Sequence, residues 1–200
     1  RNTEWNIYFG DTWQAAARLQ LHYGLRYNLR TAPHEVNRRA QVPYGCDCNN
    51  FSPRFGFAWR LTGGRDYGVL RGNYTVSYGE IFGVTYQQAR FNPPEARYIQ
   101  VANPNLLDPL AGASDQRTGL VLLSPDLVSP YSHQYNLTWQ REFQKTWTLQ
   151  LGYAGSRSFK LLMPWITNRA RNIPGLESTT KNANERRADP NHYEIVRITN

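Results

Sequence analysis

The two cysteines are the first residues whose type and spacing suggest chemistry. They form a Cys46-Asp47-Cys48 stretch inside a long polar segment. A metal site needs more ligands than two thiolates, and His34 is the one histidine in the same segment. A metal site is therefore disfavoured. A local disulfide, which suits an oxidising exterior, and two unremarkable thiols both stay open.

The other polar residues show no pattern typical of catalysis. The sequence holds no G-x-S-x-G, no H-E-x-x-H and no phosphate-binding glycine-rich loop. Asp11, Asp66 and Glu142 lie beside expected turns, and charges at a turn or rim need no acid–base role to explain them. We therefore expect a protein that is not an enzyme and that holds no cofactor.

The net charge of +8 comes from scattered arginines rather than from a basic run. An excess of positive charge is one sign of binding to nucleic acid or another acidic surface. The scatter argues against that interpretation, and several arginines fall on the polar side of expected strands. We expect no nucleic-acid partner.

The elements that must position these side chains are strands with strict alternation. Residues 131–143 and 147–153 place an aromatic or aliphatic side chain at almost every second position, with amides, hydroxyls or glycine between them. A period of two directs successive side chains to opposite faces of a strand. The same pattern recurs at 5–13, 19–27, 51–61 and 70–78, and residues 193–199 look like the start of a seventh strand.

Hydropathy alone does not decide where such strands lie. The mean hydropathy is −0.66, and no run approaches the roughly 18 apolar residues of a membrane helix. The longest aliphatic run is Leu120–Leu123. Strands of a membrane barrel need only about 9–11 residues each, half of them polar, so hydropathy misses them.

The connections between the expected strands alternate between short and long. Short connections fall at 14–17, 62–66 and 143–146, and long ones at 31–50, 80–130 and 157–190. Outer-membrane barrels have short periplasmic turns and long extracellular loops. This alternation predicts an all-β fold, an antiparallel transmembrane β-barrel segment in which the apolar strand face contacts lipid.

The apolar and polar faces of the expected strands carry the candidate membrane-interface and lumen-facing residues. A membrane interface favours indole rings at one level. Four tryptophans near the short connections are therefore expected to form a periplasmic aromatic girdle: Trp13, Trp59, Trp139 and Trp147. The lumen-facing candidates lie on the opposite face: Arg26, Arg54, Arg60, Arg71, Gln134 and Asn136.

Four stretches resemble the barrel of TonB-dependent outer-membrane receptors, in particular the Oar-like group. They are FGDTWQAAARLQLHYGLRYN at 9–28, NNFSPRFGFAW at 49–59, VLRGNYTVSYGEIF at 69–82 and SPYSHQYNLTWQREFQKTWTLQLGYAGSRSFKLL at 129–162. The resemblance implies a barrel of about 22 strands, of which this chain supplies about six or seven. Residues 1–200 would all belong to this barrel domain. The plug domain and TonB box of the family match nothing in the sequence.

The resemblance also implies partners and a location. The location would be the cell outer membrane, and the partners its lipid, the plug domain and TonB of the parent protein, and an unidentified solute. The long loops would recognise that solute, with Tyr86, Phe91 and Tyr98 as candidate contacts, although packing within the loop explains these aromatics as well.

Two other interpretations stay open. One is a small self-contained outer-membrane barrel of eight strands, acting as an adhesin or as a structural, porin-like protein. The other is a soluble β-sandwich that binds carbohydrate through its aromatic residues. If the chain is a segment of a larger barrel, we expect residues 5–13 and 193–199 to form unpaired sheet edges.

Overall fold

Six long antiparallel strands form the main sheet of the protein. The computed structural model describes the chain except for residues 38–43, 63–65, 95, 97, 98, 100, 102, 112–116 and 145 and the side chain of Tyr86. The strands follow the order β1 (Glu4–Ala16), β2 (Leu19–Arg30), β3 (Asp47–Thr62), β4 (Asp66–Tyr78), β6 (Tyr131–Phe143) and β7 (Trp147–Phe159). The prediction of an all-β antiparallel fold is confirmed.

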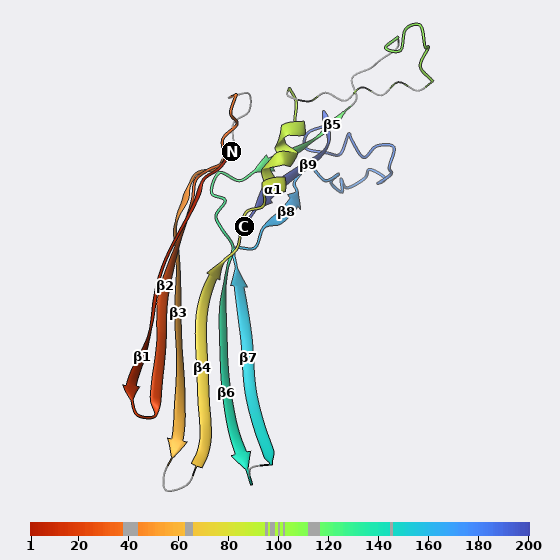
Figure 1. The fold of residues 1–200 in the computed structure, drawn as a ribbon. Coiled ribbons are helices and arrows are strands. Elements are labelled where there is room, and N and C mark those ends of the chain that lie inside the picture. The colour runs from red at the N-terminus through yellow and green to blue at the C-terminus, as the bar shows by residue number, and fades with distance from the viewer. Residues whose placement is uncertain are drawn as a thin grey trace.

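The short and long connections lie at opposite ends of this sheet (Figure 1). At one end, here called the turn end, β1 leads into β2, β3 into β4 and β6 into β7. At the other end, here called the loop end, the chain makes the longer excursions that follow β2, β4 and β7. Gln144, with a φ of 51°, lies in the turn between β6 and β7.

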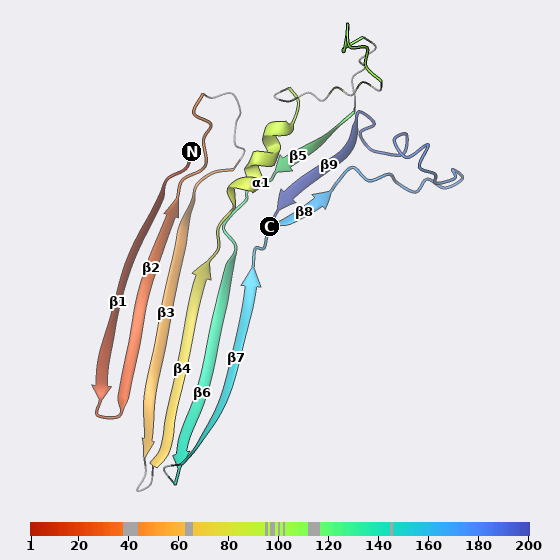
Figure 2. The same cartoon turned by 45° about the vertical axis from the view of Figure 1, so that its right-hand side comes forward.

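A second, smaller sheet lies beyond the loop end of the main sheet (Figure 2). Its order is β5 (Thr118–Leu123), β9 (His192–Thr199) and β8 (Met163–Ile166), with β5 and β9 parallel and β8 antiparallel to β9. A helical turn α1 (Gly83–Gln87) and a 3-10 turn η1 (Gln88–Phe91) precede β5.

The prediction that residues 193–199 begin a seventh barrel strand and form an open edge is wrong. These residues belong to β9, whose neighbours are β5 and β8. The physical reason is that β5, which lies within the long connection at 80–130, provides an aliphatic strand as the partner. A short alternating pattern does not specify which strand it pairs with. Among the described residues, the edges of the main sheet are β1 and β7.

The small buried core belongs to the loop end rather than to the main sheet. Tyr44, Leu123, Leu127 and Ile198 are buried together, and Val196 is among the residues packed against them. Among the described residues, no helix is both long and apolar enough to cross a membrane.

No second layer of the described residues covers the apolar face of the main sheet. The register sets Leu21 opposite Phe57, and Leu137 opposite Tyr153. Leu137 remains 46% exposed, and Leu149 remains 43% exposed. Within the described part of the chain, the apolar side chains of these strands therefore contact one another across neighbouring strands, and their outer surfaces are exposed.

Candidate functional site

The polar face of the main sheet collects amide side chains in rows. Asn28 of β2 lies opposite Asn6 of β1 and Asn50 of β3. Farther along the sheet, Asn73 of β4 lies opposite Asn136 of β6. Because paired residues in an antiparallel sheet point to the same face, the register brings these amides together on one side.

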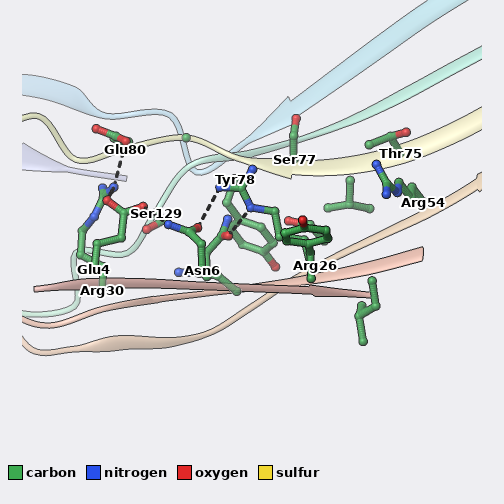
Figure 3. A pocket seen from close by; sticks show the side chains of 17 residues that line it. Glu4, Asn6, Arg26, Arg30, Arg54, Thr75, Ser77, Tyr78, Glu80 and Ser129 are labelled. Atoms are coloured by element: carbon green, nitrogen blue, oxygen red, sulfur yellow. Dashed lines mark hydrogen bonds and ion pairs between the residues drawn. The ribbon is translucent and has the colours of Figure 1, made fainter. Parts of the chain in front are cut away.

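Arg30 links three parts of this face at the loop end. Its Nη2 lies 3.0 Å from Glu4 Oε2 and 3.1 Å from Glu80 Oε1. Glu4 belongs to β1 and Glu80 follows β4, so the ion pairs reach across β3 (Figure 3). Exposed ion pairs of this kind contribute only about 0–1 kcal/mol each, so their main effect is to hold the three side chains in position.

Arg26 contacts neutral acceptors. Its Nη2 donates to Asn6 Oδ1 and its Nε donates to Asn28 Oδ1, both at 2.8 Å. These two hydrogen bonds fix the guanidinium against the sheet. They leave its positive charge without a hydrogen-bonded carboxylate in the described part of the chain.

Arg54 lies across two glycines. Gly24 is directly opposite Arg54 on β2, and Gly10 is directly opposite Gly24 on β1. A Cβ at Gly24 would stand 2.7 Å from Arg54 Nε, and a Cβ at Gly10 would stand 2.9 Å from Arg54 Nη2. The side chain of Arg54 therefore occupies space that is open because Gly24 and Gly10 have no side chains. No described residue makes a hydrogen bond or an ion pair with the guanidinium of Arg54.

A cavity of about 570 Å³ lies on this face, toward the loop end. Its lining includes all of the residues just described apart from Gly10, Gly24, Asn73 and Asn136. The remaining lining residues are Tyr8, Leu25, Ser52, Thr75, Val76, Ser77, Tyr78, Gly79 and Ser129. Asn50 is 3% exposed and Ser52 is 8% exposed. Asn50 Oδ1 and Ser52 Oγ have no hydrogen-bond partner among the described residues.

The structure brings only some of the lumen-facing candidates together. Arg26 and Arg54 line the cavity. Arg71 lies outside the cavity and donates from Nη1 to Gln140 Oε1 at 2.9 Å. Gln134 Nε2 lies 3.5 Å from Ser77 Oγ. Arg60 lies near the turn end, and Asn136 lies between Asn73 and Ala154 on the polar face.

The four girdle tryptophans lie toward the turn end on the apolar face. Trp59 pairs with Leu19 and Leu70, while Trp139 pairs with Leu70 and Leu151. The register sets Trp13 opposite Leu21 and Trp147 opposite Phe143. Trp139 also donates from its indole Nε1 to the carbonyl of Tyr67 at 2.8 Å, which satisfies the polar atom of the ring.

Asp11, Arg141 and Arg157 are charged residues on the apolar face, and each has a local partner; the guanidinium of Arg157 lies 5.0 Å from the ring centroid of Phe159. Asp11 Oδ2 accepts a hydrogen bond from the hydroxyl of Tyr23 at 3.1 Å. The guanidinium of Arg141 lies 4.7 Å from the ring centroid of Phe143 and 5.7 Å from that of Tyr67. A charge on a lipid-facing surface costs about 2–4 kcal/mol at mid-depth and about 0–1 kcal/mol near the interface. Arg141 lies two residues before the turn end of β6, which fits the lower figure, whereas Asp11 lies near the middle of β1.

Of the three candidate loop aromatics, the structure describes the side chain of Phe91 alone. Tyr86 lies in α1, and Tyr98 lies outside the described residues. Phe91 ends η1, where the guanidinium of Arg90 lies 4.6 Å from the centre of its ring. Phe91 lines a cavity of about 460 Å³ together with Tyr193 of β9.

The Cys46–Cys48 pair forms a disulfide at the start of β3. Asp47, between the two cysteines, accepts a hydrogen bond from the backbone N–H of Ser129 at 2.6 Å. The hydroxyl of Tyr27 donates to the carbonyl of Cys48 at 2.8 Å. The segment thus ties β3 to β2 and to the chain that leads into β6. Among the described residues, no group of three or more His, Cys, Asp or Glu side chains is arranged to hold a metal.

Several site residues escaped the sequence analysis. Asn50 and Ser52 share the period-two pattern of Arg54, so the polar face of β3 was a usable signal for both. Ser129 gave no such signal, because its contact with Asp47 joins residues 82 positions apart.

A family model matches the chain over residues 40–200, and its description is "Outer membrane beta barrel domain". The match covers most of the chain, so the protein belongs to this family of outer-membrane β-barrel domains. The protein is therefore located in the outer membrane. No curated protein and no solved structure matches the chain.

Proposed function

We propose that this chain is part of the barrel of a TonB-dependent outer-membrane receptor, related to the Oar-like group, and that it takes part in uptake of a solute. The observation that carries this proposal is the contrast between the two faces of the main sheet. One face exposes aliphatic and aromatic side chains, such as Leu137, and the other holds a polar cavity with arginines. Lipid outside and a wet lumen inside account for both faces.

The partners follow from the same proposal. Lipid of the outer membrane would cover the apolar face, and the plug domain and TonB of the parent protein would control passage. The solute would move along the polar face, on which the arginines, amides and hydroxyls lie. The role proposed is binding and transport rather than catalysis.

The two other interpretations from the sequence have less support. A soluble β-sandwich needs a second sheet over the apolar face, and the described residues provide none. A self-contained barrel of eight strands needs its edge strands to pair. Among the described residues, β1 and β7 are the unpaired edges of a six-stranded sheet. A larger barrel, in which further strands complete the wall, fits this arrangement better.

The proposal is tested by solute uptake in the source organism. Three strains are compared: the wild type, a strain that lacks the gene of this protein, and a strain that lacks tonB. Mass spectrometry of the spent medium identifies compounds that the wild type removes. We expect at least one compound to remain in the medium of both deletion strains, and uptake to return when the full-length gene is restored.

Two results would contradict the proposal. One is a gene deletion that leaves uptake of every compound unchanged. The other is a compound whose uptake needs this protein but continues without TonB. The second result would assign the barrel to passive transport.

A further inference from the structure

We infer that the 570 Å³ cavity binds a hydroxylated carboxylate, such as a sugar acid. This inference rests on the proposed function, because it names the class of solute that would contact the polar face. Its basis is the charge, the unpaired polar atoms and the size of the cavity.

The charges in the cavity lining do not cancel. The lining holds Arg26, Arg30 and Arg54 but only two carboxylates, Glu4 and Glu80. Both carboxylates contact Arg30, at 3.0 and 3.1 Å. The excess positive charge therefore lies toward the other two arginines.

Arg26 and Arg54 are diagonal neighbours on the sheet. Arg26 lies opposite Ser52, and Arg54 lies two residues farther along β3. Like charges on neighbouring strands repel each other. Arg26 has only amide acceptors, and no described residue makes a hydrogen bond or an ion pair with Arg54. An anion placed beside the two guanidinium groups would remove this repulsion.

The position of Arg54 favours a carboxylate. Its side chain rests on the surface left open by Gly24 and Gly10, so its path across the sheet is defined by close contacts rather than by hydrogen bonds. A planar guanidinium held in this way can donate two parallel hydrogen bonds to a carboxylate.

Buried polar atoms without partners point to hydroxyl groups on the same ligand. Asn50 and Ser52 line the cavity and are more than nine-tenths buried, at 3% and 8% exposure. Asn50 Oδ1 and Ser52 Oγ lack partners among the described residues. An amide oxygen needs a donor, which a carboxylate lacks and a hydroxyl group supplies.

The size of the cavity agrees with a small solute. Its volume of about 570 Å³ falls within the range of about 300–1,000 Å³ that is typical of small-molecule sites. Thr75 and Ser77 add hydroxyl groups to the wall, and Tyr8 and Tyr78 add aromatic rings. A sugar acid combines the carboxylate and the hydroxyl groups that this lining calls for.

The inference is tested by binding to the purified full-length protein in detergent. The probe is D-glucuronate, and the matched control ligand is D-glucuronamide, which keeps the hydroxyl groups but lacks the charge. Isothermal titration calorimetry gives both affinities. We expect the amide to bind at least tenfold more weakly than the acid.

Variants locate the site. We expect R54Q to weaken glucuronate binding at least tenfold while leaving glucuronamide binding unchanged. R54K keeps the charge but loses the paired donors, so we expect its affinity for glucuronate to lie between those of the wild type and R54Q. R18Q removes the same charge from an exposed residue between β1 and β2, far from the cavity, and should stay within twofold of the wild type.

Three results would overturn the inference. The first is unchanged glucuronate binding by R54Q. The second is inorganic phosphate binding as tightly as glucuronate, which would make the site a general anion site. The third is a wild type that binds neither probe, as expected if a carboxylate of the protein itself fills the cavity. Because binding in detergent needs no TonB, a failure of the uptake experiment leaves this measurement unaffected.

Discussion

The ring of Phe57 occupies the space beside Gly72, the residue directly opposite it on β4. A Cβ at Gly72 would overlap the ring, with Phe57 Cζ only 2.8 Å away. Tyr135 and Gly155 repeat the arrangement on β6 and β7, where Tyr135 Cε2 would lie 2.6 Å from an added Cβ. On the apolar face, an aromatic ring thus lies over a glycine of the next strand, as in other sheets where such pairs fix the register.

We expect Gly72→Ala to destabilise the barrel by about 1–3 kcal/mol, because the added methyl group forces the ring of Phe57 out of its position. Urea unfolding of the full-length protein in lipid vesicles measures the change. Gly152→Ala is the control. The nearest atom to its added Cβ is the side-chain Thr138 Oγ1 at 3.2 Å, which can move aside. Equal losses for the two variants would show that the ring contact is not the cause.

The Asp47–Ser129 hydrogen bond gives a second prediction. Asp47→Ala leaves the backbone N–H of Ser129, a residue only 4% exposed, without its acceptor. An unsatisfied buried donor costs about 1–3 kcal/mol, and we expect the free energy of unfolding to fall by that amount. The same urea unfolding experiment measures it. Asp108→Ala, in an exposed turn, should change stability by less than about 0.5 kcal/mol. A loss no larger than that of the control would count against the role of Asp47.

The stability of the segment at the start of β9 should depend on pH. His192 Nδ1 lies 2.7 Å from Asp189 Oδ2, and this hydrogen bond lowers the pKa of the Asp189 carboxyl below its usual value. A carboxyl with a lowered pKa in the folded state stabilises the fold at pH values above its ordinary pKa. That contribution is lost as the pH falls through the lowered pKa.

Hydrogen exchange of the segment around His192 checks this pH dependence. We expect the wild type to lose protection as the pH falls below the ordinary aspartate pKa of about 4, beyond the change in intrinsic exchange rate. Asp189→Asn, measured at the same pH values, should show no such additional loss. A wild type and a variant with the same pH profile would exclude the Asp189–His192 contact as the source.

The main sheet could be predicted from the sequence because its strands repeat one local signal. Strict alternation over residues 19–27 and 131–139 fixes both the strand and the face of each side chain. The same alternation led to the polar positions of Arg26 and Arg54. Local patterning therefore accounts for the face that carries the cavity.

The pairing of β9 and the contacts of the cavity could not be predicted in this way. β9 pairs with β5, a strand 74 residues earlier in the chain by the register of Thr118 with His192, and a short alternating pattern does not name its partner. The link between Arg30 and Glu80 crosses β3, and Arg54 lies across two strands. Such contacts depend on the curvature and register of the whole sheet, which no single stretch of sequence encodes.

The central claim is that the apolar face contacts lipid while the polar face contacts water, and neighbouring residues of β6 test it most directly. Leu137 and Asn136 are adjacent and point to opposite faces.

Two variants of the full-length protein, Leu137→Cys and Asn136→Cys, are prepared in lipid vesicles. A spin label is attached to the new cysteine of each variant. Cys46 and Cys48 form a disulfide, so these two residues take no label. We predict that oxygen, which concentrates in lipid, relaxes the label at position 137, and that a water-soluble nickel complex relaxes the label at position 136. A label at position 137 that is reached by the nickel complex and not by oxygen would contradict the account.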